Sequence, residues 1–293
     1  MALTLAEWRK HIDQVVADEG QWLGVADENG YPIYELLGTV NFPESHLQAA
    51  SAEATVNVQP GDQVLDDLVG ERLGEVDDAG RLVPANGATR LLLLIRPGER
   101  RAATITHTVV TGQAVPSQVT IHGVDLLDGL AAWPCPSIPL EGWEMAEWEQ
   151  WSTDASGVEY ASVRELALLQ FATTLDGYAK RGRAKSLVRE IIQDSLDAVN
   201  ALYGWVDDPH MVVEFPGDVD TSGESALRVS DDDVWSTVSE PARAAGLSVD
   251  VELWWPGDAP VRVRVDQRAT QLEERAWNHP IQVVRVREIG EVA

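Results

Sequence analysis

The residues that could carry chemistry in this chain are scattered, and their spacing predicts no reaction. The sequence holds six histidines, a single cysteine (Cys135) and 48 Asp or Glu residues. It contains no phosphate-binding or dinucleotide-binding glycine loop, no GxSxG motif and no HExxH motif. Among 48 carboxylates, a pair that imitates the acid and nucleophile of a glycosidase is expected by chance. We therefore expect no catalytic residue, no cofactor site and no enzyme activity.

Two histidines are the best candidates for a metal site. His107 and His122 fall on strands that we expect to be adjacent, so their rings could approach each other. A metal ion between them would need a carboxylate such as Asp125 as a further ligand. Because Cys135 is alone, neither a disulfide within the chain nor a cysteine zinc cluster can form. We expect two sheet histidines with ordinary hydrogen bonds and no metal.

Charge is the strongest feature of the composition. The chain has 48 acidic residues and 22 Lys or Arg residues, which gives a formal net charge of -26. Affinity for nucleic acid depends on neutralising phosphates with Lys and Arg, so this chain is not expected to wrap nucleic acid. The charge still allows nucleic acid to pass nearby without being held.

Two segments could bind a partner. Trp143, Trp148 and Trp151 lie among glutamates and could stack on sugars, dock a protein, or fill a core or subunit contact. The stretch from Lys180 to Arg189 has five basic residues and no acid. It could grip a phosphate, begin a solvated helix, or pair with an acidic neighbour. The interface candidates are therefore Trp143, Trp148, Trp151, Lys180, Arg181, Arg183 and Lys185.

The clearest elements are three β-strands in the first half of the chain. Thr89–Ile95 is an apolar run, and Arg100–Val110 and Ser117–His122 alternate, with short Gly or Pro turns between them. This pattern predicts an antiparallel meander or barrel wall. Before it we expect a helix over Thr4–Ala17 with a Thr4–Glu7 capping box, and further strands at Trp22–Ala26, Tyr31–Leu37 and Ala52–Val58.

The second half predicts a mixture of helices and strands. Helices are expected over Val163–Tyr178 and Ser186–Tyr203, and a third is expected to be capped by Ser230 and to end at Gly246. Strands are expected at Met211–Phe215, Leu247–Trp255, Val261–Val265 and Ile281–Ile289. The sequence has no apolar run of roughly 18 residues and no basic or apolar leader before Trp8, so neither a membrane span nor a signal peptide is expected.

One order of elements resembles a known family. Strands at Arg90–Ile95 and Arg101–Val110 precede Val119-Thr120-Ile121-His122-Gly123-Val124-Asp125-Leu126-Leu127, which leads into Trp133-Pro134. A strand that ends in glycine before a short leucine-rich helix resembles the tail-hub proteins of siphoviruses that infect actinobacteria, also called baseplate hub or minor tail proteins. Downstream, a helix from Ser186, the triplet Asp233-Val234-Trp235 and the stretch Ala244–Leu247 are also similar. The resemblance spans residues 20–290.

The resemblance implies an α+β fold of antiparallel β-barrel tube domains with inserted helices. The implied domains are an N-terminal helix (1–20), a first β-barrel (21–140), an acidic Trp-rich and helical region (141–210) and a second α/β tube-like domain (211–293). Three copies would place six similar barrels around the tail axis.

The implied function is a non-enzymatic structural component of a phage tail tip. Such a protein forms part of the channel and attaches other tail-tip or fibre subunits. Its implied partners are two further copies of itself, the distal tail protein and the tape measure protein, and phage DNA only passes through. The protein would be made in the host cytoplasm and reside in the virion. Six acids become candidates for the lumen: Glu44, Glu53, Asp62, Asp66, Asp67 and Glu71.

Two other classes remain open. A carbohydrate-binding receptor module would show an exposed, coplanar platform built from Trp143, Trp148 or Trp151. A cell-wall hydrolase would show converging carboxylates or a metal cluster in a deep cleft.

Overall fold

The chain divides into two compact units, each assembled from several segments. The computed structural model describes residues 3–45, 47–70, 81, 88–136, 148–167, 177–265 and 271–291. The first unit comprises Met1–Asp128, Asp250–Pro260 and Ala276–Val284, and the second comprises Gly129–Val249, Val261–Arg275 and Arg285–Ala293. The expected domain of residues 211–293 is thus shared between the two units, and strands β13 (Leu247–Trp254) and β16 (Ile281–Glu288) contribute to both.

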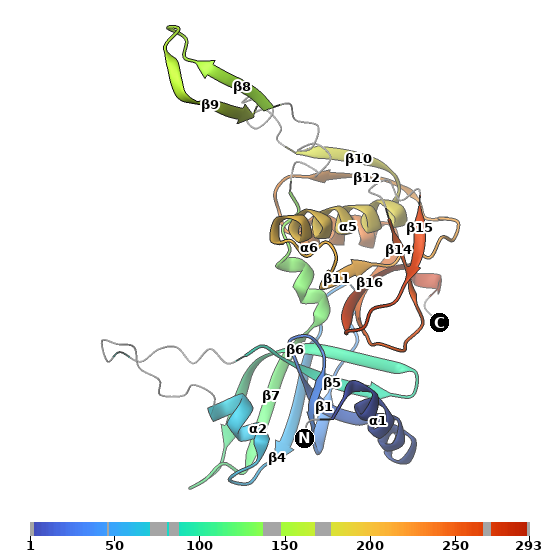
Figure 1. Ribbon diagram of the computed structural model, residues 1–293. Coiled ribbons are helices and arrows are strands. Elements are labelled where there is room, and N and C mark those ends of the chain that lie inside the picture. The colour runs from blue at the N-terminus through green and yellow to red at the C-terminus, as the bar shows by residue number, and fades with distance from the viewer. Residues whose placement is uncertain are drawn as a thin grey trace. The chain divides into compact units, whose positions relative to one another are not determined.

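The first unit is built on a seven-stranded antiparallel sheet in the order β2-β1-β5-β6-β7-β4-β3 (Figure 1). The strands are β1 (Trp22–Asp27), β2 (Pro32–Glu35), β3 (Gly38–Asn41), β4 (Ser51–Asn57), β5 (Arg90–Arg96), β6 (Glu99–Thr111) and β7 (Gln118–Asp125). The antiparallel sheet predicted for the three strands after Thr89 is confirmed. Among the described residues, β2 and β3 are edge strands that do not pair with each other, so the expected closed barrel is not observed.

The centre of strand β5, Leu91–Ile95, is apolar because both faces of the sheet are covered around it. Leu92 and Leu94 point into one buried cluster, which also contains Val25 and Ile121. Leu91, Leu93 and Ile95 point into a second cluster on the opposite face. Successive side chains of a strand alternate between faces, so an unbroken apolar run is the pattern of a strand that is buried on both.

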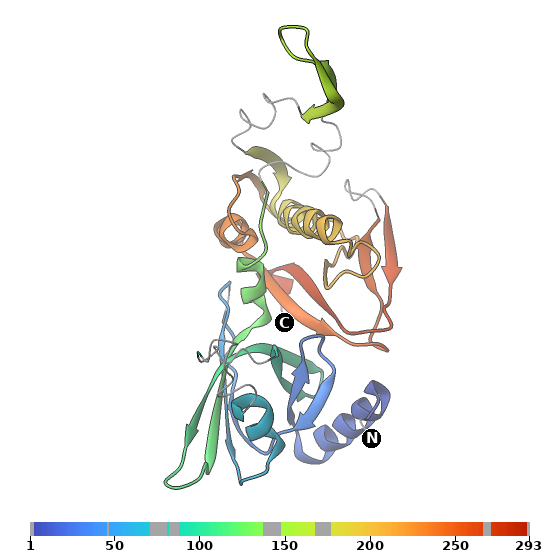
Figure 2. The ribbon, with the colours of Figure 1, turned by 60° about the vertical axis from the view of Figure 1, so that its left-hand side comes forward.

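The second cluster is covered by helix α1 (Leu5–Glu19), which lies beside β1 and β5 (Figure 2). The Thr4 hydroxyl accepts a hydrogen bond from the Glu7 amide, and the Glu7 carboxylate accepts one from the Thr4 amide. This confirms the predicted capping box. The helix ends at Gly20, whose left-handed backbone (φ 85°) suits glycine, and its Trp8 side chain is buried.

Arg100 on β6 ties the turn after β13 to the same unit. Its guanidinium donates to the Asp258 carboxylate (2.7 Å) and the Leu253 carbonyl (3.0 Å), and it lies 3.9 Å from the centre of the Trp255 ring. Arg9 of α1 pairs with the same carboxylate at 3.0 Å. Two cations therefore hold Asp258, which keeps the turn against helix and sheet although it is distant in sequence.

The second unit contains α5 (Ala184–Tyr203) and α6 (Val234–Ala244) with four small sheets. Three of these sheets have two strands each: β8 (Trp148–Thr153) with β9 (Glu159–Ala167), β10 (Tyr178–Arg183) with β12 (Glu224–Val229), and β14 (Val261–Arg264) with β15 (Leu272–Arg275). The fourth sheet has three strands, in the order β11 (Met211–Val213), β16 and β13. The described part of the chain also has short helical segments: α2 (Gln63–Leu65), a π-helical turn (Asp66–Gly70) and 3₁₀ turns at Leu126–Ala131 and Ile289–Glu291.

Two predicted elements are wrong where they can be compared, and five strands were missed. The helix expected over Val163–Tyr178 is wrong at both described ends, because Val163–Ala167 belongs to β9 and Tyr178 begins β10, while residues 168–176 lie outside the described residues. Pairing with β8 decides this segment, because its short apolar pattern fits either period. Helix α6 is capped by Asp233, whose carboxylate accepts from the Ser236 amide, and not by Ser230. The missed strands are β3, β8, β10, β12 and β15. Each is short or carries many polar side chains, so its apolar alternation is weak.

The close packing of β1 makes a sharp prediction at Gly24. A Cβ atom there would lie 2.2 Å from the Trp22 ring and 2.8 Å from the Tyr34 carbonyl oxygen, so the strand or the ring would have to move. We expect Gly24→Ala to lower the free energy of unfolding by about 1–3 kcal/mol. Gly223→Ala is the control, because a Cβ at Gly223 meets no atom within 4 Å. Denaturant melts of both variants test this, and equal stability would contradict it.

Candidate interaction surface

The two-stranded sheet of β10 and β12 has an inner face directed toward α5 (Figure 1). Leu227 and Val229 are buried on this face, and Lys180 is half-buried beside them. The Lys180 ammonium lies 2.6 Å from the Asp194 carboxylate and 3.5 Å from that of Glu190, both on α5. The charge of Lys180 is therefore neutralised within its own chain.

The outer face of this sheet is exposed and carries arginines next to alanines. Its members, which we call the arginine face, are Ala179, Arg181, Arg183, Glu224, Ala226 and Arg228. In the strand register Arg181 is opposite Ala226, Arg228 is opposite Ala179 and Arg183 is opposite Glu224. Three arginines and one acid thus share one surface of a chain whose net charge is -26.

The rest of the basic stretch is buried. Lys185 has no exposed surface, and its ammonium lies 3.0 Å from the Asp218 carboxylate and 3.2 Å from that of Glu288. Arg189 donates to the Val286 carbonyl and lies 3.6 Å from Asp218. These two cations link α5 to the segment before β12 and to β16. A buried ammonium requires such partners, because leaving it unpaired is costly.

The beginning of α5 is capped by a loop and not by its own N-cap residue. Arg183 makes no side-chain capping bond, but the Asp220 carboxylate accepts from the Ser186 amide (2.8 Å) and hydroxyl, and the Ser222 hydroxyl accepts from the Lys185 amide. Burial raises the pKa of Asp220, but the hydrogen bonds from Ser186 and Ser222 outweigh it and lower the pKa to about 2.

The β8–β9 pair, Trp148–Ala167, is a hairpin that we call the acidic hairpin. Its turn is closed by Asp154, whose carboxylate accepts from the Ser156 amide and hydroxyl and from the Val158 amide. Hydrogen bonds from Ser156 and Val158 hold the pKa of Asp154 below its usual value. Arg164 stacks on the Tyr160 ring at 4.4 Å. The turn is therefore locally ordered by its own hydrogen bonds.

Apolar side chains are exposed on this hairpin. Trp151 is 43% exposed, Val158 is 61% exposed and Val163 is 57% exposed. Of the other Trp interface candidates, Trp148 lies on β8 and Trp143 lies outside the described residues. By contrast Trp22 and Trp255 fill the core of the first unit. Trp22 and Trp255 therefore serve the core of the first unit, whereas Trp151 remains at the surface of the hairpin.

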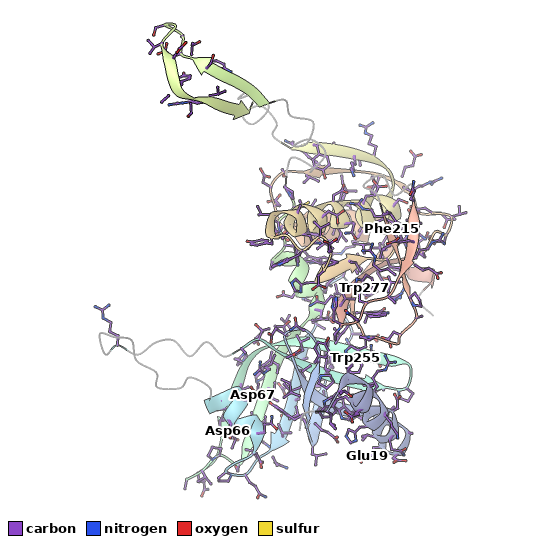
Figure 3. All side chains as sticks on the ribbon, viewed as in Figure 1. Glu19, Asp66, Asp67, Phe215, Trp255 and Trp277 are labelled. Atoms are coloured by element: carbon purple, nitrogen blue, oxygen red, sulfur yellow. The ribbon has the colours of Figure 1, made fainter. Side chains whose placement is uncertain are left out.

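The lumen candidates differ in how available their charge is. Glu44, Glu53, Asp62 and Asp66 are exposed, and Glu71 lies outside the described residues. Asp67 instead receives a bidentate ion pair from Arg90, with contacts of 2.7–3.1 Å, and a hydrogen bond from the Tyr34 hydroxyl (Figure 3). Asp67 thus holds the π-helical turn against the sheet. Burial, together with the charge of Asp67, raises the pKa of Tyr34.

The two sheet histidines do come together. A bulge in β6 between Ile105 and His107 sets His107 opposite His122, and their rings stack with centroids 4.5 Å apart. His122 contacts Glu53 at 3.5 Å, while Asp125 caps the following turn through the Leu127 amide. In the described part of the chain no group of three or more metal-binding side chains converges.

A shallow cavity of about 690 Å³ lies on the first unit, between α1 and the turn at Pro256–Gly257. Asp13 is the one carboxylate in its lining, so it does not offer the carboxylate pair that a glycosidase needs. None of the described helices has the length and apolarity that crossing a membrane requires.

Sequence reasoning found two of the six residues of the arginine face. The run from Lys180 to Lys185 pointed to Arg181 and Arg183, but it could not separate them from Lys180 and Lys185, which turn inward. Ala226 and Arg228 were missed because no element was predicted over β12. The alternation of Leu227 and Val229 with Ala226 and Arg228 was the available signal.

Comparison with known proteins gives loose matches. No family model and no curated protein matches the chain. A 43 kDa tail protein of prophage MuSo2 from Shewanella oneidensis is 8% identical at a TM-score of 0.35, over 91% of this chain and 54% of that one. A tail protein from Neisseria meningitidis MC58 is 9% identical at a TM-score of 0.35, and the match covers 92% of this chain and 73% of that one. The chain thus spans about half of the first protein, and scores this low assign neither fold nor function.

Asp67 and its neighbour Asp66 form a matched pair for mutation. Asp67→Asn removes the charge that holds Arg90, so we expect a loss of about 1–3 kcal/mol in the free energy of unfolding. Asp66→Asn changes an exposed carboxylate and should stay within about 0.5 kcal/mol. Denaturant melts at neutral pH measure both, and equal effects would show that the Arg90 pair does not stabilise the turn.

The Asp220 cap at the beginning of α5 predicts that the stability of this helix depends on pH in the acid range. The pKa of Asp220 is lower in the folded chain (about 2) than its ordinary value of 3.8, so its contribution is present above pH 3.8 and is lost as pH falls toward 2. Asp220→Ala should cost about 1 kcal/mol at neutral pH and should remove this part of the acid sensitivity. Amide exchange of α5 between pH 2 and 5 tests this; a variant with the parent's pH profile would contradict it.

Proposed function

We propose that this chain is a non-enzymatic structural subunit of a bacteriophage tail tip, similar to a baseplate hub. The supporting observation is the order β5, β6, β7, Gly123 and the 3₁₀ turn Leu126–Ala131, with Leu126, Leu127 and Leu130 buried. This is the order of elements on which the sequence resemblance to tail hubs rests.

In this proposal the chain acts in several copies around the tail axis, as a homotrimer. The exposed apolar side chains of the acidic hairpin and the exposed arginine face are surfaces suited to subunit contacts. The further partners are the distal tail protein, the tape measure protein and other tail-tip or fibre subunits.

The acidic charge fits the passage of DNA. Three copies carry a formal charge of about -78, three times the -26 of one chain. Exposed carboxylates such as Glu44, Glu53, Asp62 and Asp66 would line the channel and repel phosphate, so the genome slides without being held. Asp67, which is paired with Arg90, would not take part in that repulsion.

The decisive measurement is the mass of the native assembly and its place in the particle. We expect a purified assembly of about 96 kDa, three times the chain mass of 32.0 kDa, and labelling of the tail tip by antibodies against this chain. A monomer at all concentrations that is also absent from virions would overturn the proposal. Release of soluble fragments from peptidoglycan, abolished by changing one or two carboxylates, would favour a hydrolase instead.

A further inference from the structure

Two surfaces of the second unit are opposite in charge, and both are exposed in the single chain. They are the arginine face on β10–β12 and the acidic hairpin on β8–β9. We propose that the acidic hairpin of one copy docks on the arginine face of a second copy of this chain. This inference rests on the proposed function, which supplies the neighbouring copies.

The arginine face has the composition of a binding surface for an acidic and aromatic segment. Arg181 stands opposite Ala226, and Arg228 stands opposite Ala179, so each of these guanidinium groups has a methyl group as its cross-strand neighbour. The alanines leave shallow space in which an indole can lie flat against a guanidinium. The same arginines can form paired hydrogen bonds with carboxylates.

The hairpin supplies the matching groups. The hairpin, Trp148–Ala167, contains four acids (Glu149, Asp154, Glu159 and Glu165) and one cation, Arg164. Arg164 is engaged with Tyr160, and the indole of Trp151 is 43% exposed. The turn around Asp154 is ordered by its own hydrogen bonds, so docking loses little conformational entropy there.

The hairpin also needs a surface on which to pack. Among the described elements, its extensive contacts are those between its own two strands. Two-stranded hairpins are marginal in water unless something covers one face. A second subunit would bury Trp151, Val158 or Val163 and stabilise the hairpin at the same time.

A second copy fits better than the hairpin of the same chain. In the single chain Trp151 is exposed, and so are Arg181 and Ala226, so the hairpin does not cover the face within one molecule. The contact joins two different surfaces. Repeated by a rotation axis, each copy donates one hairpin and receives one, and such contacts can close into a ring.

The test compares self-association of full-length variants by sedimentation equilibrium at physiological salt. Arg181→Glu on the face and Trp151→Ala on the hairpin should each weaken association about tenfold or more. Arg243→Glu and Tyr203→Ala change an exposed arginine and an exposed aromatic residue elsewhere in the chain, and both should stay within about twofold. Ala226→Leu, which fills the space beside Arg181 without changing charge, should also weaken association.

A charge exchange gives the strictest form of the test. A chain with Glu149→Lys, Glu159→Lys and Glu165→Lys should associate weakly, as should one with Arg181→Glu and Arg228→Glu. A chain that carries both sets restores opposite charges and should recover association. Circular dichroism of each variant reports whether it folds.

The outcomes separate this inference from the proposed function. If the parent forms the expected assembly and the variants assemble equally well, the docking is wrong and the tail-tip proposal stands. If the parent is a monomer absent from virions, the proposed function fails and the docking fails with it. If Arg181→Glu speeds hairpin amide exchange in a monomer, the hairpin docks within its own chain, which also overturns the inference.

Discussion

Both units of this protein depend on ion pairs, because a chain with 48 acids and 22 Lys or Arg residues repels itself wherever its carboxylates are not neutralised. The scarce cations lie where elements distant in sequence meet. Arg90 holds Asp67, Arg100 holds Asp258, and Lys185 lies between Asp218 and Glu288. In the second unit Arg264 bridges Asp194 and Asp197 of α5 to β14. Most of these pairs are partly buried, where screening by salt is weak.

The arginine face stands out against this use of cations. Lys180 and Arg181 are adjacent in sequence, yet the pleat of β10 turns the first toward Asp194 and leaves the second exposed on the opposite face. The inward residue, Lys180, forms a structural ion pair with Asp194. The outward residues, Arg181, Arg183 and Arg228, are exposed positive charges in a strongly acidic protein.

The acidic surface and the paired interior support one account of the molecule. Ion pairs stabilise both units and the doubly covered sheet stabilises the first, while exposed carboxylates such as Glu44, Asp62 and Asp66 remain in solvent. A ring of such subunits would repel phosphate along a channel and attract its own neighbours through arginine. In the proposed function, association between copies and release of DNA would use charges of opposite sign on different surfaces.

The sequence by itself determined the local structure with strong patterns: the α1 capping box, the apolar β5, the alternating β6 and β7, and α5. It also placed His107 beside His122. Tertiary structure decided everything that depends on pairing. Pairing with β8 makes Glu159–Ala167 a strand, and pairing with β10 makes β12, which carries Arg228, a strand. The order of strands in the seven-stranded sheet leaves β2 and β3 as its edges. Only folding could divide the basic stretch into buried Lys185 and exposed Arg181, because a run of charges carries no information about which carboxylates will lie across from it.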